Sequence, residues 1–143
     1  MVMLTWFLLA LSLPALSLAQ TFSIKPYNET AAFIFAHTDV NHDGIMDRNE
    51  LDLGFRHYDA NLDGRVTYHE FTTFVQAQGH DPHTTHLLHA LYRAYDENKD
   101  NNVDHLDFDI IFALSDYNND GRVDRAEFIR YMSIVLESID ESV

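Results

Sequence analysis

Oxygen-bearing side chains alternate along residues 116–127, which read DYNNDGRVDRAE. Calcium binds about six to eight hard oxygens, and carboxylate and amide side chains at alternate positions of one loop can face the same ion. Gly121, at the sixth position, permits a sharp turn because it carries no Cβ. The stretch fits the pattern D-x-[DN]-x-[DN]-G-x5-E without a mismatch, which predicts a calcium-binding loop.

Three further stretches follow the same pattern. Residues 39–50 and 59–70 fit it in full, and residues 96–107 fit it with two departures. In such a loop the first, third, fifth, ninth and twelfth side chains and the seventh backbone carbonyl supply the oxygens, the ninth directly or through water and the twelfth with both carboxylate oxygens. The expected ligands are Asp39, Asn41, Asp43, Ile45, Asp47 and Glu50 in the first loop; Asp59, Asn61, Asp63, Arg65, Thr67 and Glu70 in the second; Asp96, Asn98, Asp100, Asn102, Asp104 and Asp107 in the third; and Asp116, Asn118, Asp120, Arg122, Asp124 and Glu127 in the fourth.

The four loops also share an apolar residue at the eighth position: Met46, Val66, Val103 and Val123. With these in-frame motifs the chain resembles the EF-hand calcium-binding superfamily over nearly everything after residue 30. The resemblance implies an all-α fold, an array of helix-loop-helix units whose loops pair through short β contacts at the eighth position. Four acidic, solvated turns are the alternative interpretation, and they do not explain four matches in frame.

The third loop departs from the pattern at two positions. Asn101 replaces the glycine, and asparagine tolerates a left-handed backbone better than most residues. Asp107 replaces the twelfth glutamate and is one methylene shorter, so we expect it to give a single oxygen. A six-ligand site of this kind discriminates less against magnesium. The sequence predicts three strong calcium sites and one weak or magnesium-tolerant site at 96–107, with a largely empty third loop as the alternative.

The spacing of the loops predicts which helices they share. The loops begin at residues 39, 59, 96 and 116, so only eight residues separate loops one and two, and again loops three and four. A single helix of about 11 residues, roughly 16 Å long, fits each short gap. Phe55 and Phe112 would then each serve two loops. Because loops at opposite ends of one helix cannot meet, we expect pairing of loop two with loop three and of loop one with loop four.

The first 19 residues are apolar and carry no charged side chain. They end in Ser17-Leu18-Ala19, which is typical of a signal peptide cleaved before Gln20, although no basic residue precedes the apolar run. A membrane anchor and a buried helix are the alternatives. We expect a signal peptide at 1–19, a single EF-hand domain at 20–143, and a secreted, extracellular protein.

The charge balance excludes several partners. The chain has 23 acidic and 9 basic residues and a net charge of −14. Fifteen of the acidic residues lie at expected ligand positions, and four calcium ions would change the net charge from −14 to −6. Nucleic acid and anionic membranes are poor partners, because no basic patch is present. The chain has no cysteine and no nucleophile motif, so we expect no enzyme and no disulfide.

Two further motifs leave alternatives open. Asn28-Glu29-Thr30 is an N-glycosylation acceptor or, alternatively, a helix N-cap. The histidines recur every three residues and could bind zinc or copper, or could form a polar helix face: His80, His83, His86 and His89.

The leading function is calcium-ion binding outside the cell, with calcium as a structural or stored ion. The resemblance to secreted acidic EF-hand proteins implies an extracellular or mineralising matrix as a partner. The alternative is a calcium-responsive adaptor that binds a protein partner. Such adaptors expose Met-rich grooves, whereas the expected mature chain keeps only Met46 and Met132.

Overall fold

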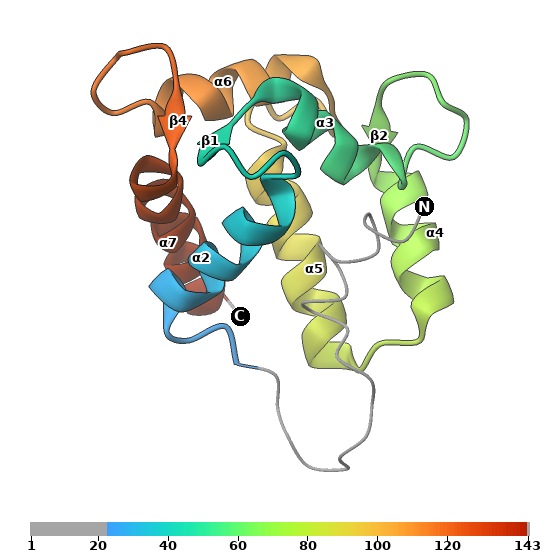
Figure 1. The fold of residues 1–143 in the computed structure, drawn as a ribbon. Coiled ribbons are helices and arrows are strands. Elements are labelled where there is room, and N and C mark those ends of the chain that lie inside the picture. The colour runs from blue at the N-terminus through green and yellow to red at the C-terminus, as the bar shows by residue number, and fades with distance from the viewer. Residues whose placement is uncertain (1–22, 143) are drawn as a thin grey trace.

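The computed structural model describes residues 23–142, and this part of the chain forms six helices and four two-residue strands (Figure 1). The predicted signal peptide at 1–19 lies outside the described residues. The elements are α2 (Tyr27–Thr38), β1 (Ile45–Met46), α3 (Arg48–Arg56), β2 (Val66–Thr67), α4 (Tyr68–Gln78), α5 (Pro82–Tyr95), β3 (Asn102–Val103), α6 (His105–Ser115), β4 (Val123–Asp124) and α7 (Arg125–Ser142).

The two short gaps between loops each hold one helix, as the spacing predicted. Helix α3 both leaves loop one and enters loop two, and α6 does the same for loops three and four. The loop residues themselves start these helices. Asp47 caps α3 by accepting a hydrogen bond from the amide of Glu50, whose carboxylate in turn accepts one from the amide of Asp47. Such a capping box satisfies two backbone donors at a helix start, so the end of each loop fixes the start of its helix.

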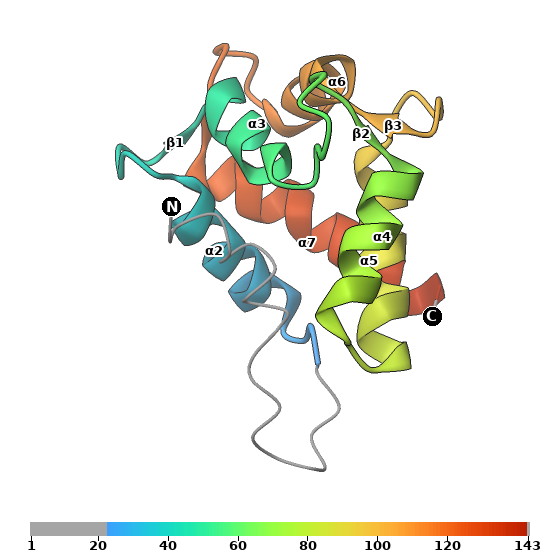
Figure 2. The ribbon, with the colours of Figure 1, turned by 90° about the vertical axis from the view of Figure 1, so that its right-hand side faces the viewer.

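The strands confirm the predicted pairing of the loops. Strand β1 pairs with β4 in antiparallel register with Met46 opposite Val123, and β2 pairs with β3 with Val66 opposite Val103. All four side chains are buried. Figure 2 shows the β2–β3 contact at the upper right, beside α6. The all-α class with an EF-hand array, shared helices and two short β pairings is therefore confirmed.

The core joins the first two loops and their helices to the last two around Phe55 of α3. Its ring centroid lies 4.8 Å from that of Tyr95 in α5 and 5.6 Å from that of Phe108 in α6. The expected counterpart of Phe55 was Phe112, but Phe112 is only half-buried, and the buried apolar residues of α6 are Phe108 and Ile111. The guanidinium of Arg48, at the start of α3, lies over the Phe112 ring at 5.5 Å from the ring centroid.

The ends of the described chain pack against each other. Helix α7 runs beyond the last loop to Ser142 and buries Leu136 and Ile139 along the way. It lies along α2, and the Tyr27 hydroxyl of α2 donates a hydrogen bond of 2.8 Å to the carboxylate of Asp140. Among the described helices, none combines the length and apolar character that a membrane crossing requires.

Candidate metal centres

The four loops repeat one set of hydrogen bonds from the backbone to the acidic side chains. In loop four the carboxylate of Asp116 accepts bonds from the amides of Asp120 (3.0 Å) and Gly121 (2.9 Å). Asn118 accepts from the amide of Asp120 (2.8 Å), and Asp120 from the amide of Arg122 (2.9 Å). The first, third and fifth side chains of the other three loops accept the equivalent bonds. The backbone therefore curls around these oxygens in every loop.

The twelfth residue closes each loop. The carboxylate of Glu127 accepts a bond of 3.1 Å from the amide of Asn118 with one oxygen and a bond of 3.1 Å from the amide of Asp124 with the other. Glu50 makes the equivalent bonds to the amides of Asn41 (3.4 Å) and Asp47 (3.0 Å), and it also accepts a bond of 2.9 Å from the amide of Val40. In this way one carboxylate ties the beginning of a loop to the helix that follows it.

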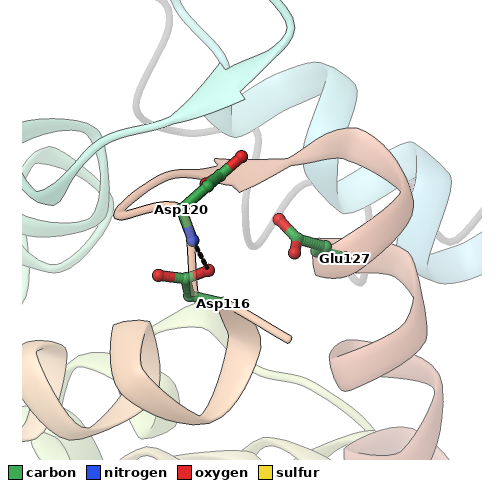
Figure 3. A group of neighbouring side chains, drawn as sticks. All are labelled: Asp116, Asp120 and Glu127. Atoms are coloured by element: carbon green, nitrogen blue, oxygen red, sulfur yellow. Dashed lines mark hydrogen bonds between the residues drawn. The ribbon is translucent and has the colours of Figure 1, made fainter. Parts of the chain in front are cut away.

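Loop four brings its acidic side chains closest together. Carboxylate oxygens of Asp116, Asp120 and Glu127 all lie within 4.8 Å of one another, and Figure 3 shows the three side chains around a common space. Within residues 23–142, no other group of three or more His, Cys, Asp or Glu side chains converges in this way. The donors are hard oxygens, which calcium and magnesium prefer, so the residues fit the expected ion.

The remaining expected ligands lie where the loop pattern puts them. The seventh residue provides only its carbonyl and stands at or directly before a strand: Ile45 and Asn102 lie in β1 and β3, and Arg65 and Arg122 precede β2 and β4. At the ninth position of loop two, Thr67 replaces an acid but still caps its helix, because its hydroxyl oxygen accepts a bond of 3.1 Å from the amide of Glu70. The assignment of all these residues as calcium ligands stays a prediction.

One position in each loop has a strained backbone that the loop pattern did not predict. The fourth residue has a positive φ in every loop, at 58° for His42, 59° for Leu62, 61° for Lys99 and 59° for Asn119. Residues other than glycine are uncommon in this left-handed region, where asparagine is favoured over bulky side chains. Asn119 and His42 are of residue types enriched at positive φ, whereas Leu62 and Lys99 carried no such signal.

The third loop keeps the shape of the others despite its two departures. Asn101 stands in place of glycine at φ 67°, and its amide bonds to Asp96 (3.0 Å) as the glycine amides do elsewhere. The shorter Asp107 still reaches the amides of Asn98 (3.2 Å) and Asp104 (3.0 Å) and is fully buried. The departures therefore change the ligand oxygens more than the fold of the loop.

Loops two and three differ in the direction in which the fold shifts the pKa of their twelfth residue. Burial acts to raise the pKa of Glu70, but hydrogen bonds from Thr67 and from two loop amides outweigh it and hold that pKa below its ordinary value. Burial raises the pKa of Asp107, and the nearby carboxylate of Asp104 adds to this, so that the amide hydrogen bonds to Asp107 do not compensate.

The ion pairs found among the described side chains lie outside the ligand positions. They join Lys25 to Asp140 (3.0 Å), Arg48 to Asp109 (2.9 Å) and Arg56 to Asp52 (2.8 Å). The loop carboxylates are satisfied by neutral amides in place of basic side chains. Clustered carboxylates repel one another at close range, so these loops favour a cation as their counter-charge.

The four histidines of the series do not converge on one point within the described chain. His83 and His86 are exposed, and the Nε2 atoms of His80 and His89 are buried without a hydrogen-bond partner. The His89 ring packs 5.7 Å from the ring of Tyr68, and burial lowers its pKa. The four rings belong to no converging group of ligands. The polar-face interpretation fits His83 and His86, and packing accounts for His89.

Comparison with known proteins agrees with this geometry. The family model described as an EF-hand domain pair matches residues 52–133, which include loops two, three and four. Loop one lies outside the matched range, and its assignment depends on its own residues and its pairing with loop four. Searches of curated proteins and of solved structures gave no match.

Proposed function

This chain belongs to the EF-hand calcium-binding family, and from that premise we propose that it is a secreted calcium-binding protein in which the ion is structural or stored. EF-hand domains indicate calcium binding, and proteins of this family are generally not enzymes. The secreted location, the number of sites and the role of the ion are the proposed parts.

The observation that carries the proposal is the convergence of Asp116, Asp120 and Glu127 within 4.8 Å, without a basic side chain paired to any of them in the described structure. Such a cluster of carboxylates is costly unless a cation neutralises it. The backbone of loop four already positions these oxygens, so little ordering has to accompany binding. Loops one and two share this backbone, which supports three strong sites.

The third loop supports a weaker site that also admits magnesium. Asp107 directs its carboxylate into the loop but is one methylene shorter than the glutamates of the other loops. A site with fewer oxygens discriminates less against the smaller, six-coordinate magnesium ion. We propose calcium in loops one, two and four, and weak calcium or magnesium in loop three.

The extracellular part of the proposal depends on the uncharged segment 1–19, taken as a signal peptide, with 20–143 as one domain. Sensor-grade EF-hand sites bind at about 10⁻⁷–10⁻⁵ M and would remain filled in an extracellular medium, where modules are adapted to about 10⁻⁴–10⁻³ M. Calcium would then not act as a switch. The acidic surface is compatible with a matrix or mineral partner.

Calorimetric titration tests the proposal directly. Calcium is titrated into chelator-stripped protein comprising residues 20–143, and the titration is repeated with magnesium present. The expected result is three strong sites that magnesium does not block and one weak site that it does. A chain that takes up no calcium would contradict the proposal, and four equal sites that magnesium does not block would contradict the weak third site.

One observation favours the adaptor as a second candidate. Leu106, Ile110 and Leu114 recur every four residues on the outer face of α6 and are 50%, 36% and 56% exposed. The matching positions of α3, 57 residues earlier, are Asn49, Leu53 and His57. An exposed apolar stripe of this kind is typical of an interaction surface. Fluorescence of a hydrophobic dye that requires calcium and is lost in Ile110→Ser would support the adaptor, and the absence of dye binding would count against it.

A further inference from the structure

The acceptor tripeptide Asn28-Glu29-Thr30 lies at the start of α2, and the structure decides between its two interpretations. Helix α2 begins after Pro26, without a hydrogen bond from a capping side chain. Asn28 is already inside the first turn, so it does not cap the helix. Its side chain is exposed to solvent, as is that of Glu29. The capping interpretation of Asn28 is therefore wrong, and no structural role in the fold competes for this side chain.

The surroundings of Asn28 have room for a bulky group. A shallow hollow of about 550 Å³ lies beside it and is lined by Lys25, Pro26, Tyr27, Asn28 and Ser133. The Oγ atom of Ser133 is buried there and has no hydrogen-bond partner in the described structure. Burying a hydroxyl without a partner is unfavourable, so a polar group that came within hydrogen-bond distance of Ser133 would stabilise this part of the surface.

The start of α2 is also remote from the candidate metal centres. Both ribbon views show it at one end of the molecule, with the four loops gathered at the opposite end (Figures 1 and 2). A large substituent on Asn28 would extend away from the loops. It would neither block a loop nor separate β1 from β4.

We propose that Asn28 carries an N-linked glycan that covers the hollow between the start of α2 and α7, at the end of the molecule opposite to the calcium loops. The inference rests on the proposed secretion, because the modification requires the secretory route. In the transfer step the Asn28 Nδ2 atom forms a bond to the anomeric carbon of the first sugar of a lipid-linked oligosaccharyl diphosphate. The bond from that carbon to the diphosphate oxygen breaks, Nδ2 loses one proton, and the lipid diphosphate leaves.

The fold also indicates when this transfer takes place. The Thr30 hydroxyl, which the acceptor motif requires, donates a bond of 2.8 Å to the carbonyl of Ile24 once α2 has formed. The Thr30 hydroxyl is therefore free for the transfer reaction only on the extended chain, before α2 forms. The other asparagines of the sequence have no Ser or Thr two residues later, so Asn28 is the single candidate.

The test is expression of the full chain in a secretory animal cell, with intact mass measured before and after treatment with a peptide N-glycosidase. The expected result is a mass excess that the enzyme removes, converting the modified asparagine to aspartate. The excess should be absent from Asn28→Gln and retained in the matched control Thr30→Ser, which keeps both the hydroxyl and the acceptor motif. Circular dichroism of each variant shows that it folds.

A second version of the chain, with residues 1–19 replaced by an established secretory leader, separates this inference from the proposed secretion. If only the replaced leader gives glycosylated protein, the secretion proposal is wrong and the acceptor site stands. Secreted but unmodified protein from both versions would overturn the inference and leave secretion intact. Removal of the glycan should leave the calcium titration unchanged, and it should increase hydrogen exchange near Tyr27 and Ser133. Unchanged exchange would overturn the placement over the hollow.

Discussion

The length of a single side chain separates the third loop from the other three. Asp107 accepts the same two amide hydrogen bonds as Glu50 and Glu127, although its side chain is one methylene shorter and is expected to supply one ligand oxygen in place of two. The fold tolerates the longer residue at this position, because Glu50 holds the equivalent place in loop one with only 5% of its surface exposed. The loops therefore differ in the number of oxygens that the twelfth residue can give to the ion, and a substitution of Asp107 can change that number.

We expect Asp107→Glu to strengthen calcium binding at loop three by about tenfold, or about 1.4 kcal/mol, because a bidentate ligand adds an oxygen. Calcium titration with and without magnesium measures the change, and magnesium should compete less in the variant. Asp107→Asn is the matched control, since it keeps the size but removes the charge, and it should weaken the site further. Four equal sites in the unmodified chain, unaltered by Asp107→Glu, would contradict this prediction.

Leu62 is the residue whose backbone conformation suits it least. It has φ 59° at the fourth position of loop two, and its side chain is 76% exposed, so little packing offsets the strain. A left-handed conformation costs an ordinary residue roughly 1–2 kcal/mol and costs asparagine less. Leu62→Asn should therefore raise the free energy of unfolding by about 0.5–1 kcal/mol.

Urea denaturation of the calcium-loaded protein measures this effect. Asn119 holds the same position in loop four at φ 59° and is already asparagine, so Asn119→Leu is the reciprocal control and should destabilise the protein. A lower denaturation midpoint for Leu62→Asn would show that the exposed leucine contributes a contact that outweighs the strain.

At the scale of elements, the loop spacing was sufficient to predict the architecture. Eight residues between two loops leave no chain for a return turn, which required a shared helix and, in consequence, the pairing of β1 with β4 and of β2 with β3. The inner face of α6 was less predictable. The spacing indicated Phe112, yet Arg48 of α3 covers that ring, and Phe108 takes the central place. Such contacts between halves depend on tertiary packing and leave no periodic signal in the sequence.

The shared helix α3 predicts that one core residue supports two loops. Phe55→Ala should lower the free energy of unfolding by about 3–5 kcal/mol, as truncation of a buried phenylalanine commonly does. It should also weaken calcium binding at both loop one and loop two, because α3 leaves the first and enters the second. Chemical denaturation gives the stability, and amide shifts of Gly44 and Gly64 during calcium titration report the two loops separately.

The matched control for this variant is Phe33→Ala in α2. The Phe33 side chain is 43% exposed, and its described ring contact is with His37 on the same helix. A change of about 0.5 kcal/mol or less is expected there. If Phe55→Ala altered only one of the two loops, α3 would not act as a common support.

At the scale of the whole molecule, the contact between α2 and α7 closes the array. Glu137, Asp140 and Glu141 make the end of the sequence acidic, yet this segment continues α7 and buries Ile139. The buried positions of this segment are hard to recognise in the sequence because Glu137, Asp140 and Glu141 lie next to them. Local composition does not show that a helix end is buried against a distant segment. In the fold, Asp140 pairs with Lys25 and accepts a hydrogen bond from the Tyr27 hydroxyl, and both residues are far from it in sequence.

Calcium is expected to decide whether this array is stable at all. The chain has no disulfide, and 15 of its 23 acidic residues lie at the ligand positions of four loops that share one core. An ion at 100 times its dissociation constant stabilises the folded state by about 2.7 kcal/mol per site, so three strong sites contribute about 8 kcal/mol. That is comparable with the entire stability of a typical domain, about 5–15 kcal/mol. We therefore expect the chelator-stripped protein to lose helix and to melt at a much lower temperature.

Far-UV circular dichroism with chelator and with calcium measures this loss. Sodium chloride is the control that separates screening from binding: it weakens the repulsion between exposed carboxylates within a Debye length of about 10 Å at 0.1 M but fills no loop. Salt should therefore restore only a small part of the helix signal, and calcium should restore it with a stoichiometry set by the loops. Identical spectra and melting temperatures with chelator and with calcium would show that the core alone holds the array together. In that case calcium would be a stored ion and not a structural one.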